Sequence, residues 1–212
     1  MAYAWEKSYP PAIRWDAEIP SRPLYFLLAD SAARFPNNPC IDFLGRRYTY
    51  AEIQALVDRA ARGFQQLGVR KGTRVGLFLP NCPQSVVSFF GVLRAGGIVV
   101  NYSPLYAEPQ IRHQVEDSGT EIMVTLDLEV LYPKVSGLVG TSPLRQLVVG
   151  NLPEVLPFPK SVLYPVFKRR ERYRGRRNDN DISFAQLIDN RGPPGAVEID
   201  AKQDIRSEEH TS

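Results

Sequence analysis

Histidine and cysteine side chains are the first candidates for chemistry in this sequence, because they titrate or act as nucleophiles and metal ligands near neutral pH. His113 has two acidic neighbours, Glu116 and Asp117, three and four positions away and no thiol at that spacing, and we expect a histidine on a helix surface. Cys40 and Cys82 lack the spacing of metal ligands, so we expect buried thiols and no structural zinc site.

Tyrosines and glycine-rich motifs complete the search for chemistry. Tyr102 and Tyr106 flank Pro104 and fit either a loop packed on the core or the wall of a ligand cavity. The patterns G-x-x-x-x-G-K-[ST], G-x-G-x-x-G and G-x-S-x-G do not occur, which argues against a P-loop enzyme, a classical dinucleotide binder and an α/β-hydrolase. We therefore assign no catalytic, cofactor-binding or metal-binding residue.

The elements that would position a site centre on residues 83–119. Val86, Phe89, Phe90 and Leu93 recur at helical spacing, which predicts a core helix. Glycines 96 and 97 predict its end, and the apolar residues 98–100 predict a parallel strand that is buried on both faces.

The same reading predicts the elements on either side. Thr49 and Glu52 form a capping box at the start of a helix that ends before Gly68. Ser21 is expected to cap a helix over 23–35, and Asp127 a helix over 128–138. The remaining predictions are a hairpin over 40–49, strands at 74–79, 122–126 and 147–149, and a helix ending at residue 118. This alternation indicates an α/β fold with a mostly parallel sheet and helices on both faces.

Three ordered motifs carry a resemblance to a known family. Residues 48–53 (YTYAEI), 75–81 (VGLFLPN) and 93–105 (LRAGGIVVNYSPL) resemble core motifs of the adenylate-forming, AMP-binding enzymes. Within that family the chain is most similar to bacterial long-chain fatty acid–CoA ligases (acyl-CoA synthetases), and residues 184–188 (FAQLI) match a segment that precedes their catalytic half. The resemblance implies the N-terminal part of that fold, incomplete.

The domain organisation follows from these motifs. We expect an extended arm over 1–22 that lies on the surface, an α/β subdomain over 23–150, and a proline-rich, basic surface excursion over 151–182. Residues 183–205 are expected to lead into a catalytic half that is missing. We interpret residues 206–212 (RSEEHTS) as a sequencing-adaptor artefact, because they are the in-frame translation of a widely used adaptor.

The resemblance also implies an activity. The intact enzyme would join a fatty acid to CoA with ATP and Mg²⁺, releasing AMP and pyrophosphate, whereas this chain alone would bind none of these and be inactive. Two alternatives remain open: a ligase for another carboxylic acid, and a non-catalytic α/β interaction module.

Charge and hydropathy bear on location. No apolar run approaches a membrane span and the first residues lack a signal core, so we expect a cytoplasmic protein. Residues 160–177 hold eight basic residues and one acid. Because apolar residues precede the basic run, it fits contact with the inner face of an anionic membrane, or a solvated loop that pairs with acidic groups; nucleic-acid binding is not expected. The basic residues are Lys160, Lys168, Arg169, Arg170, Arg172, Arg174, Arg176 and Arg177.

Overall fold

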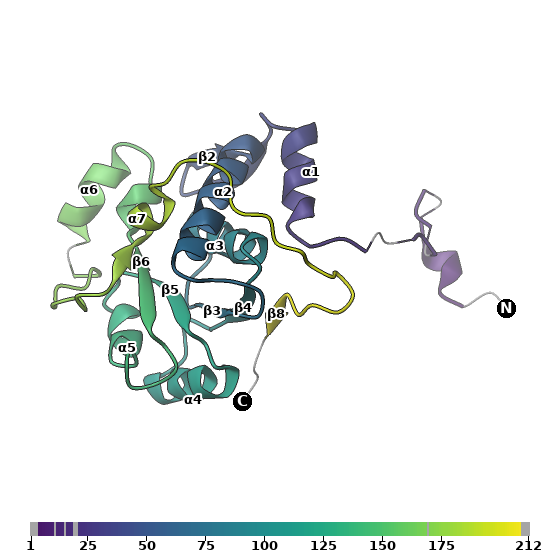
Figure 1. Cartoon of the computed structure of the whole chain (residues 1–212). Helices are drawn as coiled ribbons and strands as arrows, with labels where there is room; N and C mark the ends of the chain where they lie inside the picture. Colours follow the sequence, from purple (N-terminus) through teal and green to yellow (C-terminus); the bar gives the residue numbers. More distant parts are fainter. Residues whose placement is uncertain (1–3, 11, 15, 19–20, 169, 209–212) are drawn as a thin grey trace.

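Six parallel strands form the centre of the molecule, in the order β7-β6-β5-β3-β4-β8 (Figure 1). The structure is a computed structural model that describes residues 4–10, 12–14, 16–18, 21–168 and 170–208. Residues 98–100 lie in the sheet interior and are buried, as predicted. The strands are β3 (Arg74–Leu77), β4 (Ile98–Asn101), β5 (Ile122–Leu126), β6 (Gln146–Gly150), β7 (Ile182–Ser183) and β8 (Ser207–Glu208).

Helices cover both faces of this sheet, which confirms the predicted fold class. Helices α2, α3 and α7 form one layer, α4 and α5 lie on the other face, and α1 packs on α2 (Figure 1). Hairpin β1–β2 precedes α2, and η2 and α6 lie at the edge beyond β6. Their bounds are η1 (Glu6–Ser8), α1 (Phe26–Arg34), β1 (Pro39–Phe43), β2 (Arg46–Thr49), α2 (Tyr50–Gln66), α3 (Pro83–Arg94), α4 (Glu108–Ser118), α5 (Tyr132–Ser136), η2 (Leu152–Val155), α6 (Lys160–Phe167) and α7 (Phe184–Ile188).

Local signals set several of these boundaries. The Thr49 hydroxyl accepts from the Glu52 amide at 3.2 Å, and the Glu52 carboxylate accepts from the Thr49 amide at 2.7 Å, so the capping box is confirmed. Gly68 and Gly96 follow α2 and α3 with φ of 86° and 90°, a backbone region that costs glycine little. The sequence signals for helix ends are therefore realised.

Three predictions of local structure are wrong. Helix α1 begins at Phe26 without a side-chain cap, not after Ser21. The hairpin turn is Leu44-Gly45, one residue earlier than expected, and both residues have positive φ. Only Tyr132–Ser136 of the predicted 128–138 helix forms, because Asp127 binds arginines instead of capping a helix.

The segments at the two ends of the body were both predicted to lie at the surface. The described residues of the N-terminal arm lie beside the body (Figure 1), and its placement over the surface stays a prediction. The segment after β6 carries two short helices and is hydrogen-bonded back to the body, since the Tyr173 amide donates to the Asp127 carbonyl at 2.9 Å.

None of the helices in the described ranges is both long and apolar enough to cross a bilayer.

Candidate functional site

The connections from neighbouring strands leave the sheet on opposite faces at one point. The chain passes from β3 to α3 on one face, and from β4 to α4 on the other. Such a crossing opens a crevice at the carboxyl ends of the strands, which is where open α/β sheets bind ligands. The crevice here holds a cavity of about 400 Å³. Its lining consists of Leu77, Leu79, Asn81, Ser85, Val86, Phe89, Phe90, Asn101, Tyr102, Ser103 and Tyr106.

Helix α3 supplies the aromatic wall of this cavity. Pro83 occupies the first turn, where a missing N–H costs nothing, and the Ser85 hydroxyl donates to the Cys82 carbonyl at 2.7 Å. Phe89 and Phe90 meet edge to face with ring centroids 5.3 Å apart. Both rings are only half-buried, as is Val86, so the prediction that this stripe lies in the core is wrong for these three residues and is confirmed only for Leu93.

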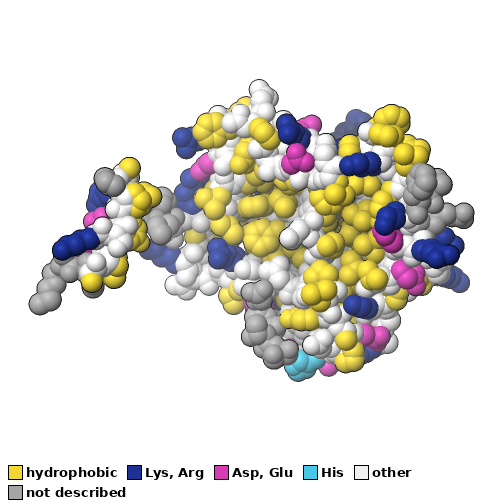
Figure 2. Space-filling model, turned by 180° about the vertical axis from the view of Figure 1, so that it is seen from behind, with side chains coloured by type: hydrophobic (Ala, Val, Ile, Leu, Met, Phe, Trp, Pro, Cys, Tyr) yellow, Lys and Arg dark blue, Asp and Glu magenta, His cyan; other side chains and the backbone are white. Residues whose placement is uncertain are grey.

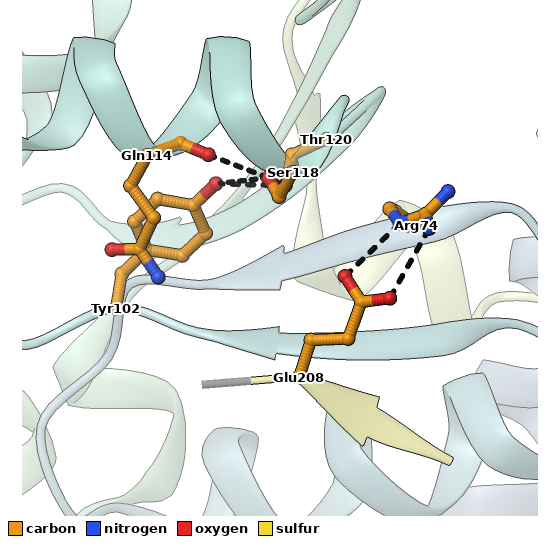
Figure 3. A network of polar contacts seen from close by, with 6 residues as sticks. All are labelled: Arg74, Tyr102, Gln114, Ser118, Thr120 and Glu208. Atoms are coloured by element: carbon orange, nitrogen blue, oxygen red, sulfur yellow. Dashed lines mark hydrogen bonds and ion pairs between the residues drawn. The ribbon is translucent and has the colours of Figure 1, made fainter. Parts of the chain in front are cut away.

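Tyr102 forms the floor of the cavity and is held by a hydroxyl network (Figure 3). Its hydroxyl is hydrogen-bonded to Thr120 Oγ1 at 2.7 Å and to Ser118 Oγ at 3.2 Å, and the Ser118 hydroxyl donates to the Gln114 carbonyl at 2.6 Å. The ring lies against Gly76, where an added Cβ would come within 2.8 Å of it. Burial raises the pKa of the Tyr102 hydroxyl, which therefore stays protonated at neutral pH.

The loop after β4 closes the side of the cavity. Lys134 of α5 donates from Nζ to the Tyr106 carbonyl at 2.8 Å, which fixes this loop to the far layer of helices. Tyr102 and Tyr106 therefore line a cavity, one of the two arrangements that the sequence left open. The sequence analysis missed the polar residues Asn81, Asn101 and Ser103, whose signal was their position at or shortly after the carboxyl ends of strands β3 and β4.

The lining of this cavity contains no lysine, arginine, histidine, cysteine, aspartate or glutamate. It can bind and orient a ligand through apolar, amide and hydroxyl contacts, but it has no cationic group to neutralise a phosphate. Across the ranges that the structure describes, no three histidine, cysteine or acidic side chains gather to hold a metal ion.

The titratable residues considered first are not part of this lining. His113 is exposed on α4, which confirms the predicted surface histidine. Cys82 is buried at the start of α3, and burial raises the pKa of its thiol. Cys40 is only half-buried, so the expectation of a buried thiol is wrong at that position.

A buried carboxylate at the carboxyl end of β5 binds part of the basic run. Asp127 is 1% exposed, and its Oδ2 accepts from Arg172 at 2.8 Å and from Arg177 at 3.0 Å. Nearby, the Tyr132 hydroxyl donates to Asp181 at 2.5 Å; burial, together with that carboxylate, raises the pKa of Tyr132 to about 12. These contacts attach the segment after β6 to the sheet.

A larger cavity, of about 690 Å³, lies at the opposite, amino end of the strands. Residues 22–25 and 199–207 form much of its wall. Near this end Arg74 donates two hydrogen bonds, each 3.1 Å, to the Glu208 carboxylate of β8 (Figure 3). We take the smaller cavity as the candidate site, because ligands of open α/β sheets bind at the carboxyl ends. The interpretation of residues 206–212 as an artefact stays a prediction.

Comparisons with known proteins agree with this architecture. Residues 28–174 match the family described as AMP-binding enzyme. A long-chain-fatty-acid–CoA ligase of Bacillus subtilis (strain 168) is 40% identical over 167 residues, which cover 79% of this chain and 30% of that protein. A 4-coumarate-CoA ligase 1 of Narcissus pseudonarcissus is 31% identical over 152 residues, which cover 70% of this chain and 26% of that protein.

A solved structure shows the same fold. A long-chain-fatty-acid-CoA ligase from Archaeoglobus fulgidus superposes with a TM-score of 0.70 at 18% identity, over 92% of this chain and 35% of that one. The chain thus spans about a third of that structure and 30% of the Bacillus ligase.

Proposed function

This chain belongs to the AMP-binding enzyme family, and from that premise we propose that it is the N-terminal α/β part of an AMP-forming acid–CoA ligase that acts on long-chain fatty acids. The observation that carries the proposal is the 40% identity to the Bacillus subtilis ligase over 167 residues. In the proposed reaction a fatty carboxylate attacks the α-phosphorus of ATP and pyrophosphate leaves. The CoA sulfur then attacks the acyl carbon, AMP leaves, and the thiol proton is lost.

The chemistry of the cavity supports a role in binding rather than in phosphoryl chemistry. Transfer of an adenylyl group needs cations or a metal to neutralise developing charge, and the lining offers none. The residues that line this cavity therefore do not fit a Mg²⁺–ATP site. We propose that Mg²⁺, ATP and CoA bind to parts of the enzyme that residues 1–205 do not supply.

A consequence is that residues 1–205 alone are inactive. Figure 2 shows hydrophobic side chains gathered into a broad, hollowed patch across one face of the body. Apolar patches of this kind mark surfaces that another part of a protein or a partner covers. The isolated chain should accordingly associate on concentration and release no pyrophosphate.

Another acid is the second candidate. The 4-coumarate-CoA ligase relative, 31% identical over 152 residues, favours it. The two candidates share the ligase chemistry and differ only in the acid that is activated.

The test is pyrophosphate release by a reading frame that extends past Ile205, assayed with ATP, Mg²⁺ and CoA. Palmitate should drive release well above that seen with 4-coumarate or benzoate, and residues 1–205 should match buffer. Preference for an aromatic acid would overturn the long-chain assignment but keep the ligase. If none of the acids causes pyrophosphate release, both the long-chain assignment and the ligase proposal are overturned.

A further inference from the structure

We infer that the hairpin tip and helix α6 together form an edge that contacts the surface of an anionic lipid bilayer. The edge does not depend on which acid the enzyme activates. It is defined here as the apolar edge, made of Leu44, Phe158, Val162 and Leu163.

These side chains are unusually exposed for their type. Phe158 is 83% exposed, Val162 62% and Leu44 59%, while Leu163 is 44% exposed. They make up four of the twelve large hydrophobic side chains that are exposed in the described ranges, although they come from two short segments. Concentration of such residues marks an interaction surface, whereas single exposed ones are ordinary.

Direct contacts join the hairpin to α6 and to the short helix η2 that precedes it. Lys160 donates from Nζ to the Leu44 carbonyl at 2.8 Å, and Arg46 donates to the Glu154 carbonyl at 2.7 Å. Residues more than a hundred positions apart therefore form one edge, at the end of the body opposite the N-terminal arm (Figure 1). Figure 2 shows hydrophobic and basic side chains next to each other at that end.

Leu44 is an unexpected residue at the tip of a hairpin. Its φ of 53° lies in the left-handed region, where turns of this type normally place asparagine, aspartate or glycine. A leucine there adds strain and exposes an aliphatic side chain to water. Contact with a hydrocarbon phase gives that side chain a function.

Several side chains of the basic run already have acidic partners, so fewer of them can contact lipid than the sequence implies. Arg172 and Arg177 bind Asp127, so these two arginines hold the segment to the body. Arg176 pairs with Asp179 at 3.0 Å, and Lys168 pairs with Glu171.

The positive charge that can face a membrane therefore comes from fewer residues than the eight basic residues of the run. Lys160 donates to a neutral carbonyl rather than to a carboxylate, and Arg170 is exposed. Arg169 and the side chains of residues 165–167 lie outside what the structure describes.

The chemistry of the edge favours lipid over nucleic acid. Three of the four members of the apolar edge, Leu44, Val162 and Leu163, are aliphatic and cannot stack on bases, and Phe158 is its one aromatic side chain. Protein surfaces for single strands rely on stacking of successive bases on several aromatic side chains. Aliphatic residues beside lysine and arginine suit the interface of an anionic bilayer, where the chains enter the acyl boundary and the cations meet lipid phosphates.

Vesicle flotation tests the inference with the 212-residue chain, because bound protein rises with the lipid while aggregates stay at the bottom. The vesicles contain phosphatidylcholine alone, or with 30 mol% phosphatidylglycerol. We expect partitioning to the anionic vesicles in low salt and at least tenfold weaker partitioning to the neutral ones. Equal binding to both would overturn the inference, as would absence of binding to either.

Variants separate the two parts of the edge. Leu44→Asn places a residue suited to the turn, so it should retain or raise thermal stability while weakening partitioning to the vesicles by at least threefold. Leu27 is a similarly exposed leucine on α1, and Leu27→Asn should change partitioning less than twofold. The double variant Lys160→Gln/Arg170→Gln should lose about 25-fold in low salt and little in high salt, because each basic residue contributes about fivefold near such a surface. Lys202→Gln is its control. Unchanged partitioning in both edge variants, or binding of a 20-base-pair duplex DNA that those variants abolish, would overturn the inference.

Discussion

The attachment of α7 to α2 depends on one glycine, and replacing it offers a sharp test of the packing. Gly63 is buried in α2, where an added Cβ would lie 2.1 Å from the Leu187 carbonyl oxygen and 2.9 Å from its Cδ1. The neighbouring Asn190 side-chain amide donates to the carbonyls of Arg59 and Leu187, each at 2.9 Å, so the end of α7 cannot move away from α2 without losing the hydrogen bond to Arg59.

The size of the expected stability change in Gly63→Ala follows from two opposing effects, the helix propensity of alanine and the overpacking against α7. Alanine in a helix gains about 1 kcal/mol over glycine, but the backbone of α7 must move by about 1 Å, and overpacking of this kind costs about 1–3 kcal/mol besides the lost contacts of Leu187. We expect Gly63→Ala to lower the free energy of unfolding by about 2 kcal/mol. With a urea m-value of about 2 kcal/mol/M, the midpoint falls by about 1 M.

Urea unfolding followed by circular dichroism measures this, and Gly137→Ala is the matched control. Gly137 has a helical φ of −73° and nothing within 4 Å of its added Cβ, so alanine there should leave stability unchanged or raise it by up to about 1 kcal/mol. Equal midpoints for the two variants would refute the described contact between α2 and α7.

Three further predictions concern burial and charge. Phe64→Ala should lower the free energy of unfolding by about 3–5 kcal/mol because Phe64 is 0% exposed, and Phe89→Ala should lower it by clearly less because that ring is half-buried in the cavity wall. Urea midpoints compare the two variants, and equal losses would contradict the placement of Phe89 in the cavity wall. Burial raises the pKa of Tyr132 to about 12, so its stabilising effect is complete below pH 10 and is lost towards pH 12. The stability of the wild type relative to Tyr132→Phe should therefore fall between pH 10 and pH 12, and a constant difference would count against the raised pKa. Asp127→Asn should speed trypsin cleavage after Arg170, because the arginines that hold this segment lose their charged partner; an unchanged cleavage rate would contradict that role.

Much of the fold was accessible from local patterns in the sequence. The capping box at Thr49 and the continuous apolar strands at 98–100 and 122–126 predicted the α2 start and the buried parallel sheet. These signals succeed because capping and two-sided burial depend on residues that are neighbours in the chain.

The candidate site was less accessible, because periodicity shows which residues share a helix face but not what lies opposite. The small residues of α3 face α2, where a Cβ on Gly91 would come within 2.9 Å of the Ala60 Cβ. The large Phe89 and Phe90 project into the cavity instead. Asp127 finds its arginine partners 45 and 50 positions later, a pairing that no local spacing predicts.

The central claim is that this chain is the N-terminal α/β part of a long-chain fatty acid–CoA ligase. The most direct measurement replaces the matching 167-residue segment of the Bacillus subtilis ligase with that of this chain and records palmitate-dependent pyrophosphate release. We predict a folded, monodisperse chimera whose kcat/KM lies within about tenfold of the parent, because losses of about 1.4 kcal/mol at a substituted interface correspond to that factor. A chimera that folds with native-like circular dichroism yet releases no more pyrophosphate than buffer would contradict the claim.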